Sequence, residues 1–190
     1  DVDDDECSEL LQVAASNPSL TDLDLSQNLI GLKEPHKVGD PEYETGVDAI
    51  AKFLESAKLL RILNLSRNYI GVQGEKESSS AVKLARSICK NTSLVTLNLA
   101  YNSMKNLPAQ ELGNSLNFNE TLEELDLSNN NVTPGACSVI ASSFAHNPSL
   151  TLLNLDGNAP GVIGSRDLLQ ALRNLKSDRR KLFVSMMNCN

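Results

Sequence analysis

The chain has 190 residues, 41% of them hydrophobic, which is enough for one domain with a sizeable buried core. Its formal net charge of −7 disfavours a nucleic-acid partner, because such partners need clustered Lys and Arg. Membrane insertion is not predicted either, since no apolar run approaches the length of a bilayer span and residues 1–6, DVDDDE, are acidic where a secretory signal would be basic.

The first predicted elements are a helix over residues 5–16 and a strand within residues 19–31, SLTDLDLSQNLIG. In the strand, Leu23 and Leu25 alternate with polar residues, so one face of the strand is apolar and the other is exposed to solvent. The complete stretch follows the order L-x-x-L-x-L-x-x-N-x-I, with its asparagine at Asn28. Alternation alone does not explain that asparagine.

The same order returns four more times along the chain, with Ile70, Met104 and Val132 at the last position but Pro160 there in the fifth copy. The lead leucines of the five copies are Leu20, Leu60, Leu94, Leu122 and Leu150, and the asparagines are Asn28, Asn68, Asn102, Asn130 and Asn158. The last two intervals between lead leucines are equal, which predicts a repeat unit of about 28 residues. The first two units are longer and carry insertions of about twelve and six residues, within residues 32–45 and near residues 72–79.

A helix is predicted in each unit, because pairs of apolar residues four apart lie on one helical face. The pairs are Leu10 and Ala14, Ile50 and Leu54, Leu84 and Ile88, Leu112 and Leu116, Ile140 and Phe144. Most of these helices are followed by an asparagine, at Asn17, Asn91, Asn119 or Asn147. We expect these asparagines to adopt the left-handed conformation that ends a helix.

The last predicted helix covers residues 165–176. Beyond it, Leu182 and Val184 alternate as Leu153 and Leu155 do, close to one repeat unit later. They predict a partial sixth strand near residue 182, with its asparagine displaced to Asn188.

These copies resemble leucine-rich repeat proteins, specifically the long-repeat subfamily that includes ribonuclease inhibitor, over nearly the whole chain. Unrelated βα units would not place an asparagine at one offset in all five copies. The resemblance implies an α/β solenoid of about five to six repeats, a right-handed superhelix with parallel strands on the concave face and helices on the convex face. It also implies that the asparagines form a structural ladder. We expect a single domain over residues 1–190, either complete or as a fragment of a longer protein.

No catalytic arrangement is predicted. His36 and His146 have no motif around them, and the four cysteines form no C-x-x-C pair. Asp22 and Asp24 could imitate a two-carboxylate site, but the position of Asp24 is filled by Asp or Asn in every copy. We therefore predict no enzyme, no cofactor, no metal and no small-molecule substrate. The cysteine usage favours a reducing, cytoplasmic location.

The strands do offer a surface for a partner. Its outward residues form three predicted columns: Asp22, Ile62, Thr96, Glu124 and Leu152; Asp24, Asn64, Asn98, Asp126 and Asn154; and, at the strand exits, Gln27, Arg67, Tyr101, Asn129 and Gly157. Exposed aliphatic residues beside Arg and Tyr suit a protein partner. The first insertion adds His36 and Tyr43 as candidate contacts, although a long surface loop is also tolerated without any function.

The predicted function is a non-enzymatic protein-binding module or scaffold that uses the concave strand face and the strand-exit loops. Two alternatives remain open. One is a regulator of a small GTPase, similar to the Ran GTPase-activating protein. The other is a structural subunit of a cytoskeletal or ciliary assembly, bound along its helices.

Overall fold

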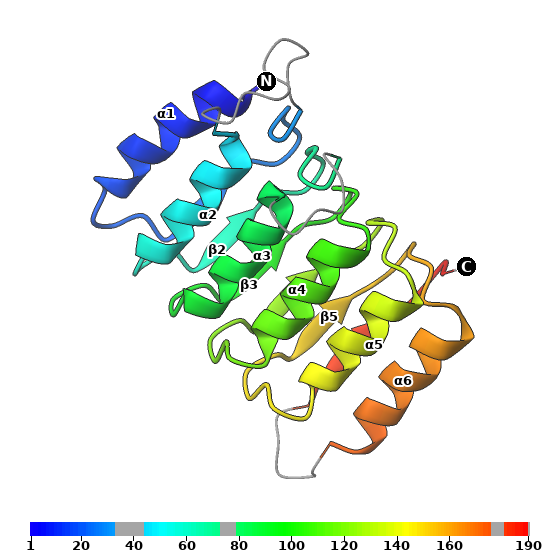
Figure 1. The fold of residues 1–190 in the computed structure, drawn as a ribbon. Helices are drawn as coiled ribbons and strands as arrows, with labels where there is room; N and C mark the ends of the chain where they lie inside the picture. The colour runs from blue at the N-terminus through cyan, green and yellow to red at the C-terminus, as the bar shows by residue number, and fades with distance from the viewer. Residues whose placement is uncertain (33–43, 73–78, 176–180, 190) are drawn as a thin grey trace.

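The computed structural model describes residues 1–32, 44–72, 79–175 and 181–189, in which helices and strands alternate (Figure 1). The helices are α1 (Asp4–Ala15), α2 (Gly46–Ser56), α3 (Ser80–Lys90), α4 (Asn106–Leu116), α5 (Pro134–Ser143) and α6 (Gly161–Arg173). The strands are β1 (Asp22–Asp24), β2 (Ile62–Asn64), β3 (Thr96–Asn98), β4 (Glu124–Asp126), β5 (Leu152–Asn154) and β6 (Phe183–Ser185).

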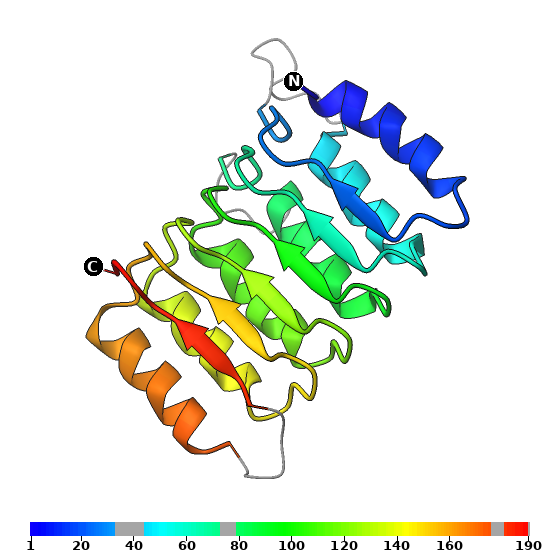
Figure 2. The ribbon, with the colours of Figure 1, turned by 180° about the vertical axis from the view of Figure 1, so that it is seen from behind.

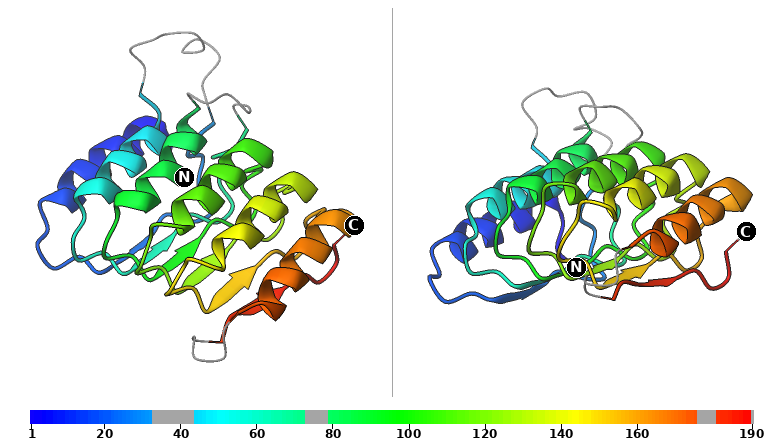
Figure 3. Two further views of the ribbon diagram at one scale, coloured as in Figure 1. Left: turned by 60° about the horizontal axis from the view of Figure 1, so that its bottom comes forward. Right: turned by 90° about the horizontal axis from the view of Figure 1, so that it is seen from below.

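The six strands form one parallel sheet in the order β1-β2-β3-β4-β5-β6. The helices cover one side of this sheet (Figure 1), and the other side is open (Figure 2). Figure 3 shows the two layers from other directions. Neighbouring strands pair in the register of the repeats, with Leu63 opposite Leu97 and Leu97 opposite Leu125. The predicted α/β solenoid is confirmed. We call the open side the strand face and the outer side of the helices the helix face.

The core lies between the two layers. Leu63, Leu97 and Leu125 are at most 1% exposed, and helix pairs such as Leu84 and Ile88 are equally buried. The helix α1 is the exception, because its buried apolar residues are Cys7 and Leu11, whereas the predicted pair Leu10 and Ala14 is only partly buried. One unit cannot bury its own leucines, so each repeat is stabilised by its neighbours.

The consensus asparagines form the expected ladder. The Nδ2 of Asn130 donates to the carbonyls of Leu99 (2.8 Å) and Ser128 (3.1 Å), while its Oδ1 accepts from the N–H groups of Asn102 and Met104, both at 3.1 Å. The same type of link to neighbouring repeats is made by Asn68, Asn102 and Asn158. These amides satisfy buried backbone groups that the turn leaves without partners.

The asparagines after the helices do not adopt the predicted left-handed conformation. Asn91 has φ −73° and ψ 132°, which is extended backbone. They form a second ladder instead. The Nδ2 of Asn119 donates to the carbonyls of Ile88 (2.8 Å) and Asn91 (3.0 Å), and its Oδ1 accepts from the N–H of Leu122 (2.8 Å). Asn91 and Asn147 make equivalent bonds. The prediction was wrong because the side chain, rather than a special backbone conformation, satisfies the helix end.

The sixth strand was predicted in the wrong register. Val184, rather than Leu182, lies opposite Leu153, so Leu182 precedes the strand. The position of the asparagine is taken by Cys189, whose Sγ lies 3.4 Å from the carbonyl oxygen of Leu155. Asn188 is therefore not the ladder residue. The preceding helix α6 also begins one turn before the predicted range of 165–176.

Candidate functional site

The register of the sheet assembles the predicted columns on the strand face. The first column contains Asp22, Ile62, Thr96, Glu124, Leu152 and also Phe183, and the second contains Asp24, Asn64, Asn98, Asp126, Asn154 and also Ser185. The last member of each column was missed, because the sixth strand was predicted in a different register. His36 and Tyr43 lie outside the described residues.

The second column has the same structural task in the five repeats from β1 to β5. The Oδ1 of Asp126 accepts from the N–H of Ser128 (2.8 Å), which closes the turn where the strand ends. The same bond to the residue two further on is made by Asp24, Asn64, Asn98 and Asn154. Hydrogen bonds from Ser26 hold the pKa of the Asp24 carboxyl below its ordinary value. The turn thus explains the consensus Asp or Asn at this position.

The two columns of the strand face carry charge of one sign. Their charged residues are Asp22, Asp24, Glu124 and Asp126, and neither of these described columns contains a Lys or Arg. On the helix face, by contrast, charges pair between neighbouring helices: Lys90 with Glu55 at 2.9 Å and Arg86 with Glu111 at 3.2 Å. The two columns therefore form a negatively charged stripe on the strand face, next to Arg67 of the strand exit.

The residues of the third column stand where the chain leaves each strand. This strand-exit ridge comprises Gln27, Arg67, Tyr101, Asn129, Gly157 and Asn188, and each has a positive φ between 53° and 67°. The left-handed region favours glycine, so a bulky residue such as Tyr101 is unusual there. The conformation is held from the next repeat, because the N–H of Tyr101 donates to the carbonyl of Ser128 at 2.9 Å.

Two ridge residues contact each other across the repeats. The guanidinium carbon of Arg67 lies 4.4 Å from the centre of the Tyr101 ring, a cation–π arrangement, and Tyr101 is still 47% exposed. Each side chain limits the motion of the other, so less rotamer entropy remains to be lost when a partner binds. The pair is a preorganised contact point that combines a planar cation and an aromatic ring.

Exposed apolar side chains accompany the ridge and the columns. Ile62 and Leu152 are 42% and 37% exposed as expected, and Phe183 reaches 66%. In the segments that follow β1 and β2, exposed Leu32 and Val72 were overlooked. A signal was present, since both stand two residues after the consensus isoleucine, in I-G-L and I-G-V.

The comparisons with known proteins agree with this geometry. The sequence profile described as "Leucine Rich repeat" matches residues 16–33 and 118–141. Mouse ribonuclease inhibitor is 30% identical over 181 residues, which is 94% of this chain and 36% of the inhibitor. The chain is a leucine-rich repeat protein of the ribonuclease-inhibitor-like type.

Further similar proteins show how much of their length this leucine-rich repeat chain matches. The bovine "NACHT, LRR and PYD domains-containing protein 3" is 29% identical over 173 residues, 90% of this chain and 15% of that protein. The solved structure titled "Leiomodin-1 Actin-Binding Site 2 (ABS2)" aligns over 89% of each chain with a TM-score of 0.59 and 18% identity, which supports the fold alone. The chain spans between 15% and 36% of the length of the bovine and mouse relatives.

We predict that the leucine-rich repeat chain tolerates Tyr101→Gly without a large loss of stability. The loss of the contact with Arg67 is offset by relief of the left-handed strain at Tyr101, each being about 1 kcal/mol. Tyr101→Ala, which removes the ring but keeps the strain, is the matched control and should be less stable than Tyr101→Gly by about 1 kcal/mol. Urea unfolding of the three proteins measures this, and an alanine variant more stable than the glycine variant would contradict it.

A buried polar cluster joins α2 to α3. The carboxylate of Asp48 accepts from Thr45 (2.8 Å), Ser80 (2.8 Å) and the ammonium of Lys83 (2.7 Å). Burial raises the pKa of Asp48, but these hydrogen bonds outweigh burial and hold the pKa below its ordinary value. The cluster fixes the first turns of both helices, directly after the two insertions.

This gives a pH-dependent prediction for Asp48→Asn. Because the folded pKa is below the unfolded one, the charged Asp48 stabilises the fold above about pH 4, and this contribution is lost as the pH falls further. We expect the variant to be about 1–2 kcal/mol less stable at pH 7, with the difference narrowing below pH 4. Glu120→Gln, at an exposed carboxylate, is the control and should match the wild type at both pH values. A pH-independent difference for Asp48→Asn would contradict the assignment.

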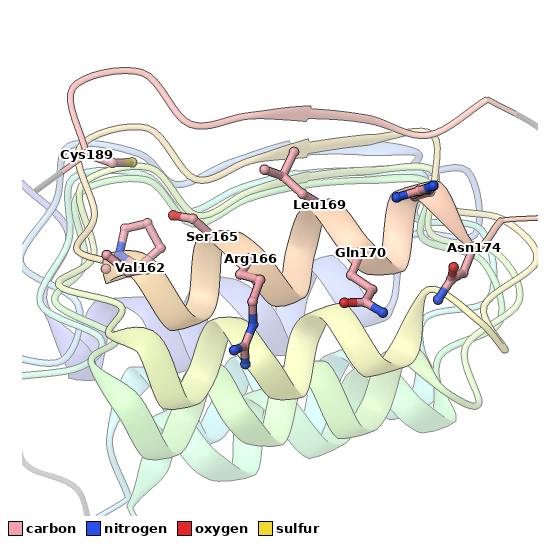
Figure 4. Close-up of a pocket in the computed structure, with 10 residues that line it drawn as sticks. Val162, Ser165, Arg166, Leu169, Gln170, Asn174 and Cys189 are labelled. Atoms are coloured by element: carbon pink, nitrogen blue, oxygen red, sulfur yellow. The ribbon is translucent and has the colours of Figure 1, made fainter.

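Among the described residues, no group of three His, Cys, Asp or Glu side chains is placed to hold a metal ion. A groove of about 960 Å³ exists, but it lies along the outer side of α6 rather than on the strand face (Figure 4). In the described part of the chain, no helix is long and apolar enough to cross a bilayer.

Proposed function

We propose that this leucine-rich repeat chain is a binding module for a protein partner, which it holds with its strand face and strand-exit ridge. The observation that carries the proposal is the Arg67–Tyr101 pair. Folding does not require a side chain at this position, since Gly157 fills the equivalent place two repeats later. Arg and Tyr are residue types that dominate the energy of protein interfaces.

The surroundings of the pair indicate the character of the partner. Ile62 supplies exposed apolar area, and the carboxylates of Asp22 and Glu124 occupy the same column. The strand face therefore suits a surface that carries Lys or Arg together with apolar side chains. One relative is named for inhibiting ribonuclease, which is itself a protein, and this agrees with a protein-directed role rather than catalysis.

A comparison of variants as bait tests the proposal. Proteins captured from the source cell by the wild type are identified, and each is then measured against purified Arg67→Gly and Tyr101→Gly chains. Both glycines fit the left-handed backbone, so the fold is kept while the side chains are removed. Asn114→Ala, at an exposed position on the helix face, is the control. A true partner loses about tenfold or more in affinity with each ridge variant and none with the control.

The proposal is refuted if a captured protein binds the ridge variants as tightly as the wild type. Crosslinking of the same complex supplies a second readout, since contacts on α2–α5 instead of the strands would favour the structural-subunit alternative. Stimulated GTP hydrolysis by a candidate GTPase would favour the regulator alternative. The cytoplasmic location stays a prediction from the sequence.

A further inference from the structure

The strand face repeats its chemistry every third strand between β1 and β5, which lie side by side in Figure 2. An acidic residue stands in both columns at β1 and β4, an aliphatic residue stands beside an asparagine at β2 and β5, and neutral polar residues occupy β3. In strand order, the first column is Asp22, Ile62, Thr96, Glu124 and Leu152, and the second is Asp24, Asn64, Asn98, Asp126 and Asn154. The turn explains Asp or Asn in the second column, but it does not explain why both acids of that column coincide with acids of the first.

The acidic groups of this pattern are open to a partner. Asp22, Asp24 and Glu124 are exposed, and Asp126 is half-buried. In the described part of the chain, no ion pair joins any of these four carboxylates to a Lys or Arg. The aliphatic groups between them are also exposed, as shown above for Ile62. The strand face therefore offers acidic and apolar contacts in a fixed order.

The spacing of the strands matches one class of partner. Adjacent strands lie about 4.8 Å apart, so the five positions of a column stand at about 0, 5, 10, 14 and 19 Å. In an α-helix, residues i, i+3, i+7, i+10 and i+14 lie on one face at about 0, 4.5, 10.5, 15 and 21 Å along the axis. An extended segment turns side chains to one side only about every 6.8 Å, so it is about 8 Å out of register by the fifth strand. A helix laid across the strands meets every position.

We propose that the strand face binds an amphipathic α-helix of a partner protein, which lies across the strands from β1 to β5. This helix carries Lys or Arg at i and i+10, over the carboxylates of β1 and β4, and apolar residues at i+3 and i+14, over Ile62 and Leu152. The same order in the opposite chain direction has equivalent spacing. The inference rests on the function proposed above, because it names the partner of the same face.

Selection from a library of displayed helices tests this proposal on the 190-residue chain. The probes are Ala-rich peptides of about 20 residues, which is long enough for a helix, randomised at i, i+3, i+7, i+10 and i+14. Binders should carry basic residues three places apart in this row of five, and apolar residues three places apart beside them. Replacement of a central residue of a binder by Pro should abolish binding, because an interior Pro breaks a helix. A binder that tolerates this Pro would indicate an extended segment and overturn the proposal.

Variants of the chain then locate the bound helix by fluorescence anisotropy. Asp22→Arg and Glu124→Arg avoid the turn-forming second column, and each should weaken the selected peptide about tenfold or more. Replacement of the facing Lys or Arg of the peptide by Glu should restore affinity for Glu124→Arg. Ile62→Ser gives a readout independent of charge and should also weaken binding. Glu9→Arg, an equal change of charge at an exposed position of α1, is the matched control and should leave affinity unchanged. Circular dichroism confirms that each variant is folded.

Binders that lack the recurrence of basic and apolar residues overturn the inference, and so does unchanged affinity with Asp22→Arg and Glu124→Arg. The same variants separate this inference from the function proposed above. A captured partner that loses affinity with Arg67→Gly and Tyr101→Gly, but not with Asp22→Arg or Glu124→Arg, would leave the binding module standing and refute the helix across the columns. A partner that ignores the ridge variants would instead refute the proposed function itself.

Discussion

Gly71→Ala is expected to destabilise the protein by more than about 3 kcal/mol. A Cβ at this position would stand 2.0 Å from the carbonyl oxygen of Ser103 and 2.7 Å from the Cα of Met104. Both atoms belong to the backbone of the next repeat, so no rotation of a side chain relieves the collision. The N–H of Gly71 also donates to the carbonyl of Asn102 at 2.8 Å, which fixes the distance between the two repeats.

Gly135→Ala is the matched control for this prediction. Gly135 lies in α5, and a Cβ there would meet only the flexible end of Gln110 at 3.5 Å. Alanine favours a helix by about 1 kcal/mol over glycine, so this variant should be slightly more stable than the wild type. Urea unfolding followed by circular dichroism compares the two variants. Equal midpoints for Gly71→Ala and the wild type would show that the repeats are not packed as described.

Asn130→Ala is expected to remove about 3–5 kcal/mol of folding free energy. The fully buried amide of Asn130 makes four hydrogen bonds, three to backbone groups of the preceding repeat and one within its own turn. Alanine leaves the N–H groups of Asn102 and Met104 without this acceptor in a site closed to water, whereas the carbonyls of Leu99 and Ser128 keep bonds from Asn102 and Tyr101. Loss of a buried partner is more costly than loss of an exposed one, because the groups left behind stay desolvated.

The exposed Asn114 in α4 provides the comparison for Asn130. Asn114→Ala replaces an asparagine in a helix by the best helix former, so its stability should equal or slightly exceed that of the wild type. Equilibrium unfolding in guanidinium chloride measures both variants. If the unfolding free energy of Asn130→Ala were less than about 1 kcal/mol below that of the wild type, the asparagine ladder would not contribute appreciably to stability.

Much of the fold could be predicted from the sequence, because five copies of the same repeat pattern each indicate the same strand and turn. Leucines at a common offset set the register, so Leu63, Leu97 and Leu125 line up as expected. The ladder role of the consensus asparagines was likewise predictable, since one residue type at one position in every copy indicates one task. The strand-face columns followed from the same register. Whether they bind a partner is a separate question, which the ridge variants address.

Other features of the structure could not be predicted from the residue types alone. Asn91 and Asn119 were assigned a backbone conformation, but a side-chain amide can also satisfy a helix end, and the sequence does not distinguish these solutions. In the last unit, Leu182 and Val184 both satisfy an alternating pattern, so the register was decided by packing against β5. The left-handed backbone conformation of Arg67 and Tyr101 could not be predicted from the sequence, because neither residue type favours it.

The two asparagine ladders also determine how the molecule would yield under tension. Each amide reaches only the adjoining repeats, so a pull along the solenoid loads the links in series, and no long-range brace among the described residues shares the force. Rupture of one link frees a single repeat, roughly 95 Å of extended chain, before the next is strained. Under tension the chain is therefore expected to lengthen stepwise, one repeat at a time, while the remaining repeats stay folded.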